Sequence, residues 1–318
     1  MQAKGQEMKD QYNLESADMP NLRLCFPSME GQVNCMHAKL MLLSYPTNLR
    51  IAVPTANFVK YDWGESGEME NSVFLVDLPR LSPTQQPSPT HMTEFGNELI
   101  YFLKAMGLEA SLIDSLSSFD FSATKDLAFV HTTGGSHVGD KWRRTGYCGL
   151  GRAVQGLGLG TDKALDIDFV ASSIGSLNID FLAMLYLAAK GDDGTKEYGW
   201  RNPDSARAKS KGSKSDLERV EQDQQKIKDE IRGNFRIFFP TNETVRASTA
   251  RSAGTICFQP QWYNSPTFPR YAFRDCKSTR PGLLMHNKVS NLAHPSPTSL
   301  LTYADSSLRL DLVRTPQS

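Results

Sequence analysis

A short chemical motif, histidine followed two residues later by lysine, occurs twice in this chain, each time beside apolar residues. His37 and Lys39 precede Leu40-Met41-Leu42-Leu43, and His286 and Lys288 follow Leu283-Leu284-Met285. On a β-strand, residues two apart project from the same face, so each copy is expected to present an imidazole and an ammonium group side by side. One such motif arises often by chance, but here two of only six histidines share both the lysine offset and a preceding methionine.

Two histidine-lysine pairs that face each other could hold a phosphate group. Histidine supplies a nucleophilic nitrogen and transfers protons near neutral pH. Lysine supplies a fixed positive charge for phosphoryl oxygens. The alternative for either copy alone is a strand-end histidine beside a lysine whose stem lies along apolar surface.

Strands and helices that could position these motifs follow from the apolar periodicity. Strands are predicted at residues 22–26, 39–45, 49–54, 73–76, 127–131, 167–170, 235–239 and 283–289. Helices are predicted at residues 95–106, 110–118 and 179–189, and a further helix from residue 242. Residues 190–215 form a polar insertion, and 216–232 a highly charged helix interpreted as a solvated spacer. Strands that alternate with helices predict the α/β fold class, with sheets covered by helices.

Composition narrows the class of function. The 318 residues carry a formal net charge of zero, so no global field draws the protein to DNA or membrane, and nucleic-acid contacts must come from local patches. No apolar stretch approaches the ~20 residues of a membrane-spanning helix, so we expect no membrane partner and an intracellular protein. The five cysteines are scattered and odd in number, which argues against a disulfide framework and a structural zinc site.

Two basic clusters leave alternatives open. Lys141-Trp142-Arg143-Arg144 could follow a DNA strand with a stacking aromatic ring, or could be the solvated start of a helix. The second cluster is either a flexible charged loop or a nuclear-localisation signal, and it comprises Arg207, Lys209, Lys211 and Lys214.

Several runs of sequence resemble the tyrosyl-DNA phosphodiesterase family of the phospholipase D superfamily. The most specific is Met36-His37-Ala38-Lys39-Leu40-Met41-Leu42-Leu43, followed by Arg50-Ile51-Ala52-Val53-Pro54-Thr55-Ala56-Asn57-Phe58 and by Asp62-Trp63. Further support comes from Ser172-Ser173-Ile174-Gly175-Ser176-Leu177, Phe239-Pro240-Thr241, Val245-Arg246 and Met285-His286-Asn287-Lys288. Phospholipase-D-type members carry an aspartate five residues after the motif lysine, where this chain has Ser44. The resemblance is therefore to the tyrosyl-DNA branch.

The resemblance implies two pseudo-symmetric phospholipase-D-like α/β/α sandwich lobes that each contribute one His-x-Lys to a central cleft. Residues 1–125 would form the first lobe, with His37 and Lys39. Residues 126–318 would form the second lobe, with His286, Lys288 and the polar insertion at residues 190–215.

The roles of five residues are carried over from the same resemblance. His37 matches the nucleophile that attacks a DNA 3′-phosphate and displaces the tyrosine of a stalled topoisomerase, which leaves a phosphohistidine. His286 matches the general acid that protonates the tyrosyl oxygen and then activates water. Lys39, Lys288 and Asn57 match donors to the non-bridging oxygens, work done elsewhere by metal ions. No cofactor and no metal is implied. From the residues alone, Asn57 could instead cap a turn.

Substrate contacts are implied for Ser173 and Ser176, which match serines that hold the DNA backbone, and for Asn71, near the position of an amide beside the DNA. Ordinary loop positions remain the alternative for all three. The implied partners are DNA with a 3′-blocked end, single-stranded or nicked, and a topoisomerase-derived peptide, and the protein is expected to be a monomer in the nucleus. The competing functions are a catalytically impaired DNA-end-binding remnant and a phospholipase-D-type hydrolase.

The resemblance ends after the second motif. No asparagine lies between Leu292 and Ser318, so the partner of Asn57 in the second lobe is absent, and the prolines and serines there predict irregular structure. About twenty mostly polar residues precede residue 22, where the family has a strand, a helix and a strand. We therefore expect a chain that is truncated at both ends relative to the family, with an incomplete second lobe.

Overall fold

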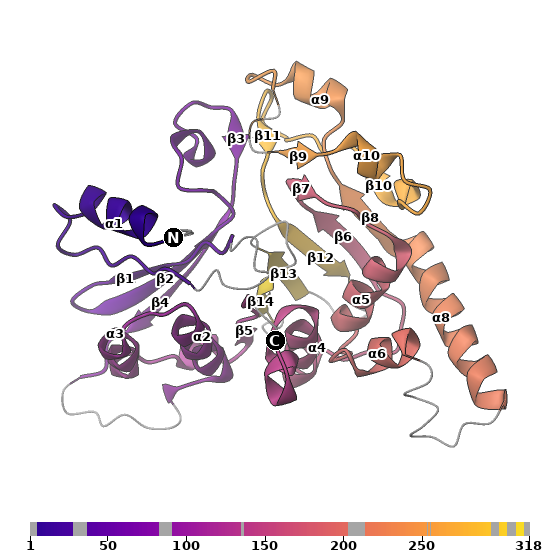
Figure 1. Ribbon diagram of the computed structural model, residues 1–318, viewed down its shortest axis with the longest axis horizontal. Coiled ribbons are helices and arrows are strands. Elements are labelled where there is room, and N and C mark those ends of the chain that lie inside the picture. Colours follow the sequence, from indigo (N-terminus) through magenta and orange to yellow (C-terminus); the bar gives the residue numbers. More distant parts are fainter. Residues whose placement is uncertain are drawn as a thin grey trace.

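The computed structural model describes residues 5–27, 37–82, 91–134, 137–202, 214–252, 254, 256–293, 299–303 and 310–314, and Figure 1 shows their arrangement. The helices are α1 (Gln6–Glu15), α2 (Glu94–Ala105), α3 (Ala110–Ser115), α4 (Gly146–Gly156), α5 (Ile179–Ala189), α6 (Thr195–Arg201), α8 (Lys214–Asn234), α9 (Asn242–Ala247) and α10 (Pro260–Tyr263). The strands are β1 (Met41–Ser44), β2 (Asn48–Pro54), β3 (Met69–Glu70), β4 (Val73–Pro79), β5 (Leu127–Ala128), β6 (Asp166–Val170), β7 (Ser173–Ile174), β8 (Phe235–Phe238), β9 (Cys257–Phe258), β10 (Phe273–Arg274), β11 (Leu284–Met285), β12 (Val289–Ala293), β13 (Ser299–Tyr303) and β14 (Leu310–Arg314).

An antiparallel three-stranded sheet of order β1-β2-β4 forms one half of the molecule. Leu49, Ile51 and Val53 alternate along β2 and pack in one apolar cluster with side chains of α2 and α3. The opposite face carries the ion pair of Arg50 with Asp77, at 2.8 Å. This alternation has the period of two that a half-buried strand requires, so the predicted strand at residues 49–54 is confirmed.

A seven-stranded mixed sheet of order β10-β8-β6-β12-β13-β14-β5 forms the other half. Strands β6, β8 and β10 are parallel, and β12 joins β6 antiparallel, with Val289 opposite Val170. The main core packs β6 and β8 against α4, α5 and α8. Helix α5 matches the predicted bounds of 179–189, and Asn178 caps it by accepting a hydrogen bond of 2.8 Å from the Phe181 amide.

Helix α8 differs from the expected solvated spacer. Ile227 and Ile231 are buried in the main core, and Lys228 pairs with Asp180 of α5 at 2.9 Å. Most residues of α8 are charged or polar, but these two isoleucines form a short apolar stripe on one face. The interpretation as a solvated spacer is therefore wrong for the part of the helix beside α5 and β8. The predicted polar insertion at residues 190–215 also contains α6, while residues 203–213 lie outside the described part of the chain.

The two sheets are joined by a short parallel pair, β3 with β11. The amide of His286 donates to the Glu70 carbonyl at 2.8 Å, and the Leu284 amide donates to the Glu68 carbonyl at 2.9 Å. The Glu70 side chain accepts from the Ser278 hydroxyl, which lowers the pKa of this carboxyl group. The segment that carries the second His-x-Lys motif is therefore fixed to the end of the first sheet.

A second connection lies at the junction of α2 with the polypeptide around α4. The buried Glu98 carboxylate pairs with Arg144 at 2.9 Å, with Arg152 at 3.1 Å and with His131 at 3.2 Å. The Arg144 guanidinium also stacks over the Tyr101 ring, 3.9 Å from its centroid. Arg144 is thus engaged within the protein, which neither alternative for the Lys141–Arg144 cluster predicted.

Two further predictions of local structure are wrong. Residues 22–26 are not in a strand, and the sequence before them forms the helix α1 instead. The segment after the second motif, predicted to be irregular, contributes β12, β13 and β14 to the seven-stranded sheet. The prolines at positions 295, 297 and 316 lie outside the described residues, so the prediction is wrong only for the segments that form these strands. Within the described residues, no helix is both long and apolar enough to span a bilayer.

Candidate active site

Both His-x-Lys motifs lie in extended segments next to strands rather than in the predicted strands themselves. His37 and Lys39 precede β1, and His286 and Lys288 lie between β11 and β12. The two-residue spacing still brings each pair together: Lys39 Nζ is 2.6 Å from His37 Nδ1, and Lys288 Nζ is 3.0 Å from both ring nitrogens of His286. The predicted pairing of imidazole and ammonium is confirmed in both copies.

The Asn71 amide orients the His286 ring. Asn71 Nδ2 donates to the carbonyl oxygen of Asp62 at 2.8 Å, so Asn71 Oδ1 must be the atom 2.8 Å from His286 Nδ1. An amide oxygen only accepts, which assigns the proton of the neutral ring to Nδ1 and leaves Nε2 to accept from Lys288. The structure thus places Asn71 behind His286, and a direct contact of Asn71 with DNA stays a prediction.

The Lys288 ammonium group is buried and makes contacts in both halves of the molecule. Lys288 Nζ donates to the carbonyl oxygens of Thr55, at 3.0 Å, and of His286, at 2.9 Å. Next to it, the Ser72 hydroxyl donates to Asn287 Oδ1 at 2.7 Å. A charge out of water requires such partners, and here they include Thr55 at the end of the first sheet and His286 of the motif itself.

Asn57 is held by a buried carboxylate in the loop that follows it. Both its backbone amide and its side-chain Nδ2 donate to Asp62 Oδ2, each at 2.7 Å, while the Trp63 indole donates to the Asn57 carbonyl at 2.7 Å. The short helix η1 (Lys60–Trp63) has Val59 at its N-cap position and no side-chain cap, so the alternative of Asn57 as a turn cap is wrong. The structure makes Asn57 the donor and Asp62 the acceptor.

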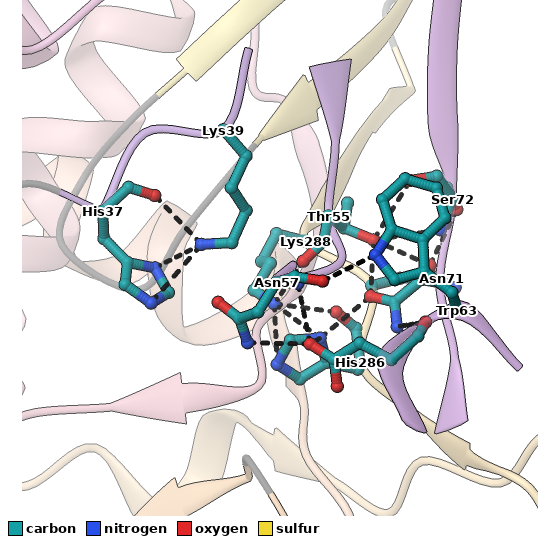
Figure 2. Close-up of polar contacts among 11 residues, drawn as sticks. His37, Lys39, Thr55, Asn57, Trp63, Asn71, Ser72, His286 and Lys288 are labelled. Atoms are coloured by element: carbon teal, nitrogen blue, oxygen red, sulfur yellow. Dashed lines mark hydrogen bonds and ion pairs between the residues drawn. The ribbon is translucent and has the colours of Figure 1, made fainter. Parts of the chain in front are cut away.

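His286 also lies close to charged groups, and Figure 2 shows Lys288, Asn57 and Asn71 next to its ring. Asp62 Oδ2 is 3.7 Å from His286 Nδ1. Burial, the charge of Lys288 and smaller effects of Lys39 and His37 together lower the pKa of His286 to about 3, although Asp62 opposes them. Figure 2 shows His37 with Lys39 on one side of the view and His286 with Lys288 on the other, and a single site formed by both motifs stays a prediction.

The predicted DNA-contacting serines lie at the end of the second sheet that carries the second motif. Ser173 belongs to β7, which pairs with β9, and Ser176 follows in the loop that leads to α5. Strand β6 ends at Val170 opposite Val289, next to Lys288, so the loop with both serines leaves the sheet at that same edge. The hydroxyl of the neighbouring Ser172 is buried and has no hydrogen-bond partner within the described structure.

The sequence analysis missed Asp62 as a site residue, along with Thr55 and Ser72. Asp62 is 1 % exposed although its neighbours Trp63 and Lys60 face solvent. The only signal in the sequence is its position five residues after Asn57. Burial of a single carboxylate produces no hydrophobic periodicity from which it could be predicted. Within the residues that the structure describes, no group of three histidine, cysteine or carboxylate side chains could hold a metal ion.

Each motif combines an ammonium group with the nitrogens of an imidazole ring. Two ammonium groups can neutralise an anion, and two imidazoles can attack it and exchange protons with it. The chemistry that fits these groups is nucleophilic displacement at a phosphorus atom.

Comparison with known proteins matches residues 1–301 to the family described as Tyrosyl-DNA phosphodiesterase. Among solved structures, the chain is similar to yeast tyrosyl-DNA phosphodiesterase, with a TM-score of 0.56 at 15% identity over 87% of this chain and 68% of that one. A histidine-to-asparagine mutant of the yeast enzyme gives a TM-score of 0.55 at 14% identity over 87% and 67% of the two chains. A histidine-to-arginine mutant of the yeast enzyme gives the same four values. The mixed α/β fold therefore resembles that of the yeast enzyme, and the chain belongs to the tyrosyl-DNA phosphodiesterase family.

Proposed function

We propose that this protein hydrolyses 3′-phosphotyrosyl and other 3′-blocked DNA ends through a phosphohistidine intermediate, in the repair of topoisomerase damage. The observation that carries the proposal is that each motif histidine contacts its own lysine, His37 with Lys39 at 2.6 Å and His286 with Lys288 at 3.0 Å. Family membership supports the same chemistry. Two pseudo-symmetric lobes with the DNA passing between them, and a location in the nucleus, form part of this proposal.

In the first step, a ring nitrogen of His37 attacks the phosphorus atom of the 3′-phosphodiester. A phosphorus–nitrogen bond forms and the bond from phosphorus to the tyrosyl oxygen breaks. Protonated His286 gives its Nε2 proton to the tyrosyl oxygen, so tyrosine or its peptide leaves neutral. Lys39, Lys288 and the Nδ2 of Asn57 stabilise the charge on the non-bridging oxygens.

In the second step, His286 accepts a proton from a water molecule that attacks the phosphorus atom. The phosphorus–nitrogen bond breaks, which returns His37 and releases DNA with a 3′-phosphate. The two imidazoles thus have different duties: one is covalent and the other transfers protons in both steps.

Binding of the substrate has to make His286 a proton donor. Without an anion, burial and the ammonium groups of Lys288 and Lys39 hold the pKa of His286 low, so its ring is neutral at physiological pH. A phosphodiester placed among Lys39, Lys288 and His37 would offset their charge and raise this pKa. Protonation of His286 is therefore coupled to occupation of the site.

The two other functions differ in their support. A phospholipase-D-type hydrolase is disfavoured because position 44 is a serine at the exposed end of β1, where Arg80 donates to its hydroxyl at 3.3 Å. A DNA-end-binding remnant is favoured by one observation, that no asparagine lies between Leu292 and Ser318, where the resemblance places the partner of Asn57.

The test uses an oligonucleotide with a 3′-phosphotyrosine in the presence of chelator. The proposal predicts release of tyrosine and a 3′-phosphate, and loss of both in His37→Ala. Binding without release would establish the remnant, and release of choline from phosphatidylcholine with no reaction of the oligonucleotide would establish the phospholipase.

A further inference from the structure

We propose that Asp62 is a positioning residue of this site: its carboxylate fixes the amide of Asn57 and supports His286 as the proton donor to the leaving group. This inference rests on the proposed function and adds to it a residue from the loop after β2. It concerns how the two candidate groups of the reaction are held, not the groups themselves.

The carboxylate of Asp62 determines which way the Asn57 side chain points. An ionised carboxylate only accepts hydrogen bonds, so the atom 2.7 Å from Asp62 Oδ2 must be the amide nitrogen of Asn57. Because the backbone amide of Asn57 donates to the same oxygen, main chain and side chain are fixed together. One hydrogen of Nδ2 is used in this bond, and the second is the one that can be donated to a phosphate oxygen.

The same oxygen atom lies 3.7 Å from Nδ1 of His286, and the Asp62 side chain is fully buried. A negative charge at this distance in a water-poor environment favours the imidazolium form. The groups that act on the ring from the elements around it are Lys288 on its own segment, Asp62 in η1, and Lys39 with His37 before β1. Asp62 is the acidic member of this set, so its charge opposes that of all the others.

Asn71 and Asp62 both act on Nδ1 of His286, so Nε2 is the nitrogen that can transfer a proton to the substrate. Asn71 Oδ1 accepts from Nδ1, and its own Nδ2 donates to the Asp62 carbonyl, so both residues keep the Nδ1 proton in place. A second proton can then enter only at Nε2, where Lys288 donates in the absence of substrate. When a phosphodiester draws Lys288 onto its oxygens, Nε2 takes up the proton that the tyrosyl oxygen will receive.

The experiment compares two esters that differ in their need for an acid. Thymidine 3′-phosphate is esterified either with 4-nitrophenol, whose anion leaves readily without protonation, or with phenol, whose anion leaves poorly. We expect Asp62→Asn to slow cleavage of the phenyl ester at least about tenfold more than cleavage of the 4-nitrophenyl ester. Asp77→Asn, which removes an exposed carboxylate of β4, is the matched control and should leave both rates unchanged.

A second pair of variants separates the two arms of the proposal. Asn57→Ala should slow both esters equally because Asn57 acts on non-bridging oxygens. In the Asn57→Ala background, Asp62→Asn should lose its effect on the 4-nitrophenyl ester and keep its extra effect on the phenyl ester. Equal slowing of the two esters by Asp62→Asn, or full additivity with Asn57→Ala, would overturn the proposal.

A readout independent of turnover distinguishes this inference from the proposed function. The histidine Cε1–H resonances are titrated in the full chain saturated with inorganic phosphate, and His286 is identified by comparison with His286→Asn. Asp62→Asn should lower the pH at which His286 protonates, whereas Asp77→Asn should not. If wild type cleaves neither ester, the proposed function fails, while an unchanged His286 titration in Asp62→Asn refutes the role of Asp62 by itself.

Discussion

Lys288 Nζ donates a hydrogen bond of 3.0 Å to the main-chain carbonyl oxygen of Thr55, across 233 residues of sequence. Thr55 directly follows β2 of the three-stranded sheet, and Lys288 directly precedes β12 of the seven-stranded sheet. The lysine side chain is 2 % exposed, so its charge depends on these partners. The geometry of the candidate site and the contact between the two sheets are therefore determined together.

Replacement of Lys288 by methionine should affect stability and activity at once. Two buried carbonyl oxygens, of Thr55 and His286, would lose their donor, which costs about 1–3 kcal/mol of unfolding free energy. Loss of the charge at the phosphate position should reduce turnover roughly 10²- to 10³-fold. Urea unfolding and single-turnover rates measure the two effects. Lys277→Met, which removes a mostly exposed ammonium group, is the control, and identical behaviour of both variants would contradict the assignment.

The stability of the protein should decrease on mild acidification because of His286. Its pKa in the folded state, about 3, lies below the value of ~6.5 in an unfolded chain. Between these values the unfolded state binds the extra proton, so the free energy of unfolding rises with pH in this window, by at most about 1.4 kcal/mol per pH unit. The contribution is complete above pH ~6.5 and is lost as the pH falls towards 3.

This dependence is measured by urea unfolding between pH 7.5 and 5.5. In His286→Asn, the unfolding free energy should change less steeply with pH than in wild type, because one fewer proton is taken up on unfolding. An equal slope in the two proteins would mean that His286 is not held neutral by its surroundings.

The two histidines should behave differently in a trapping experiment. His286→Asn keeps the nucleophile but loses the group that activates water, so a covalent adduct should accumulate with an oligonucleotide whose 3′-phosphate is esterified with 4-nitrophenol, a leaving group that needs no acid. His37→Ala lacks the nitrogen that forms the bond and should give none. Denaturing gels of labelled DNA detect the species, and His91→Ala controls for loss of a histidine elsewhere. An adduct with His37→Ala would reverse the two roles.

The ion cluster of Glu98 should be a main contributor to the junction of α2 with α4. Glu98→Ala leaves Arg144 and Arg152 without their shared partner and should cost about 3 kcal/mol, at the low end for breaking a buried pair since both guanidinium groups still reach water. The exposed neighbour Glu94 provides the control, because its pair with Arg152 should contribute less than about 1 kcal/mol. Thermal or urea unfolding of both alanine variants gives the comparison.

Local patterns predicted those elements whose stability depends on their own periodicity. Phe95, Leu99, Phe102 and Leu103 recur at helical spacing and all are buried in α2, and the apolar run of α5 has the predicted bounds. The strands predicted at residues 49–54 and 73–76 are present as β2 and β4, which pair antiparallel. Patterns failed for α8, where two isoleucines among many charges decide the packing, and for β13 and β14, whose pairing depends on strands far away in sequence.

The sequence by itself determined the pairing of each histidine with its lysine, because a spacing of two residues in extended backbone places both side chains on one side. Only the tertiary structure decided that the carboxylate of Asp62 is buried, that it holds Asn57, and that it lies beside His286. Asn71, which the sequence suggested as a DNA contact, came to lie behind the His286 ring for the same reason. Hydrophobic periodicity indicates which face of a helix or strand packs against the core. The hydrogen-bond partners of a single buried polar group come from segments that are distant in sequence, and only the folded chain brings them together.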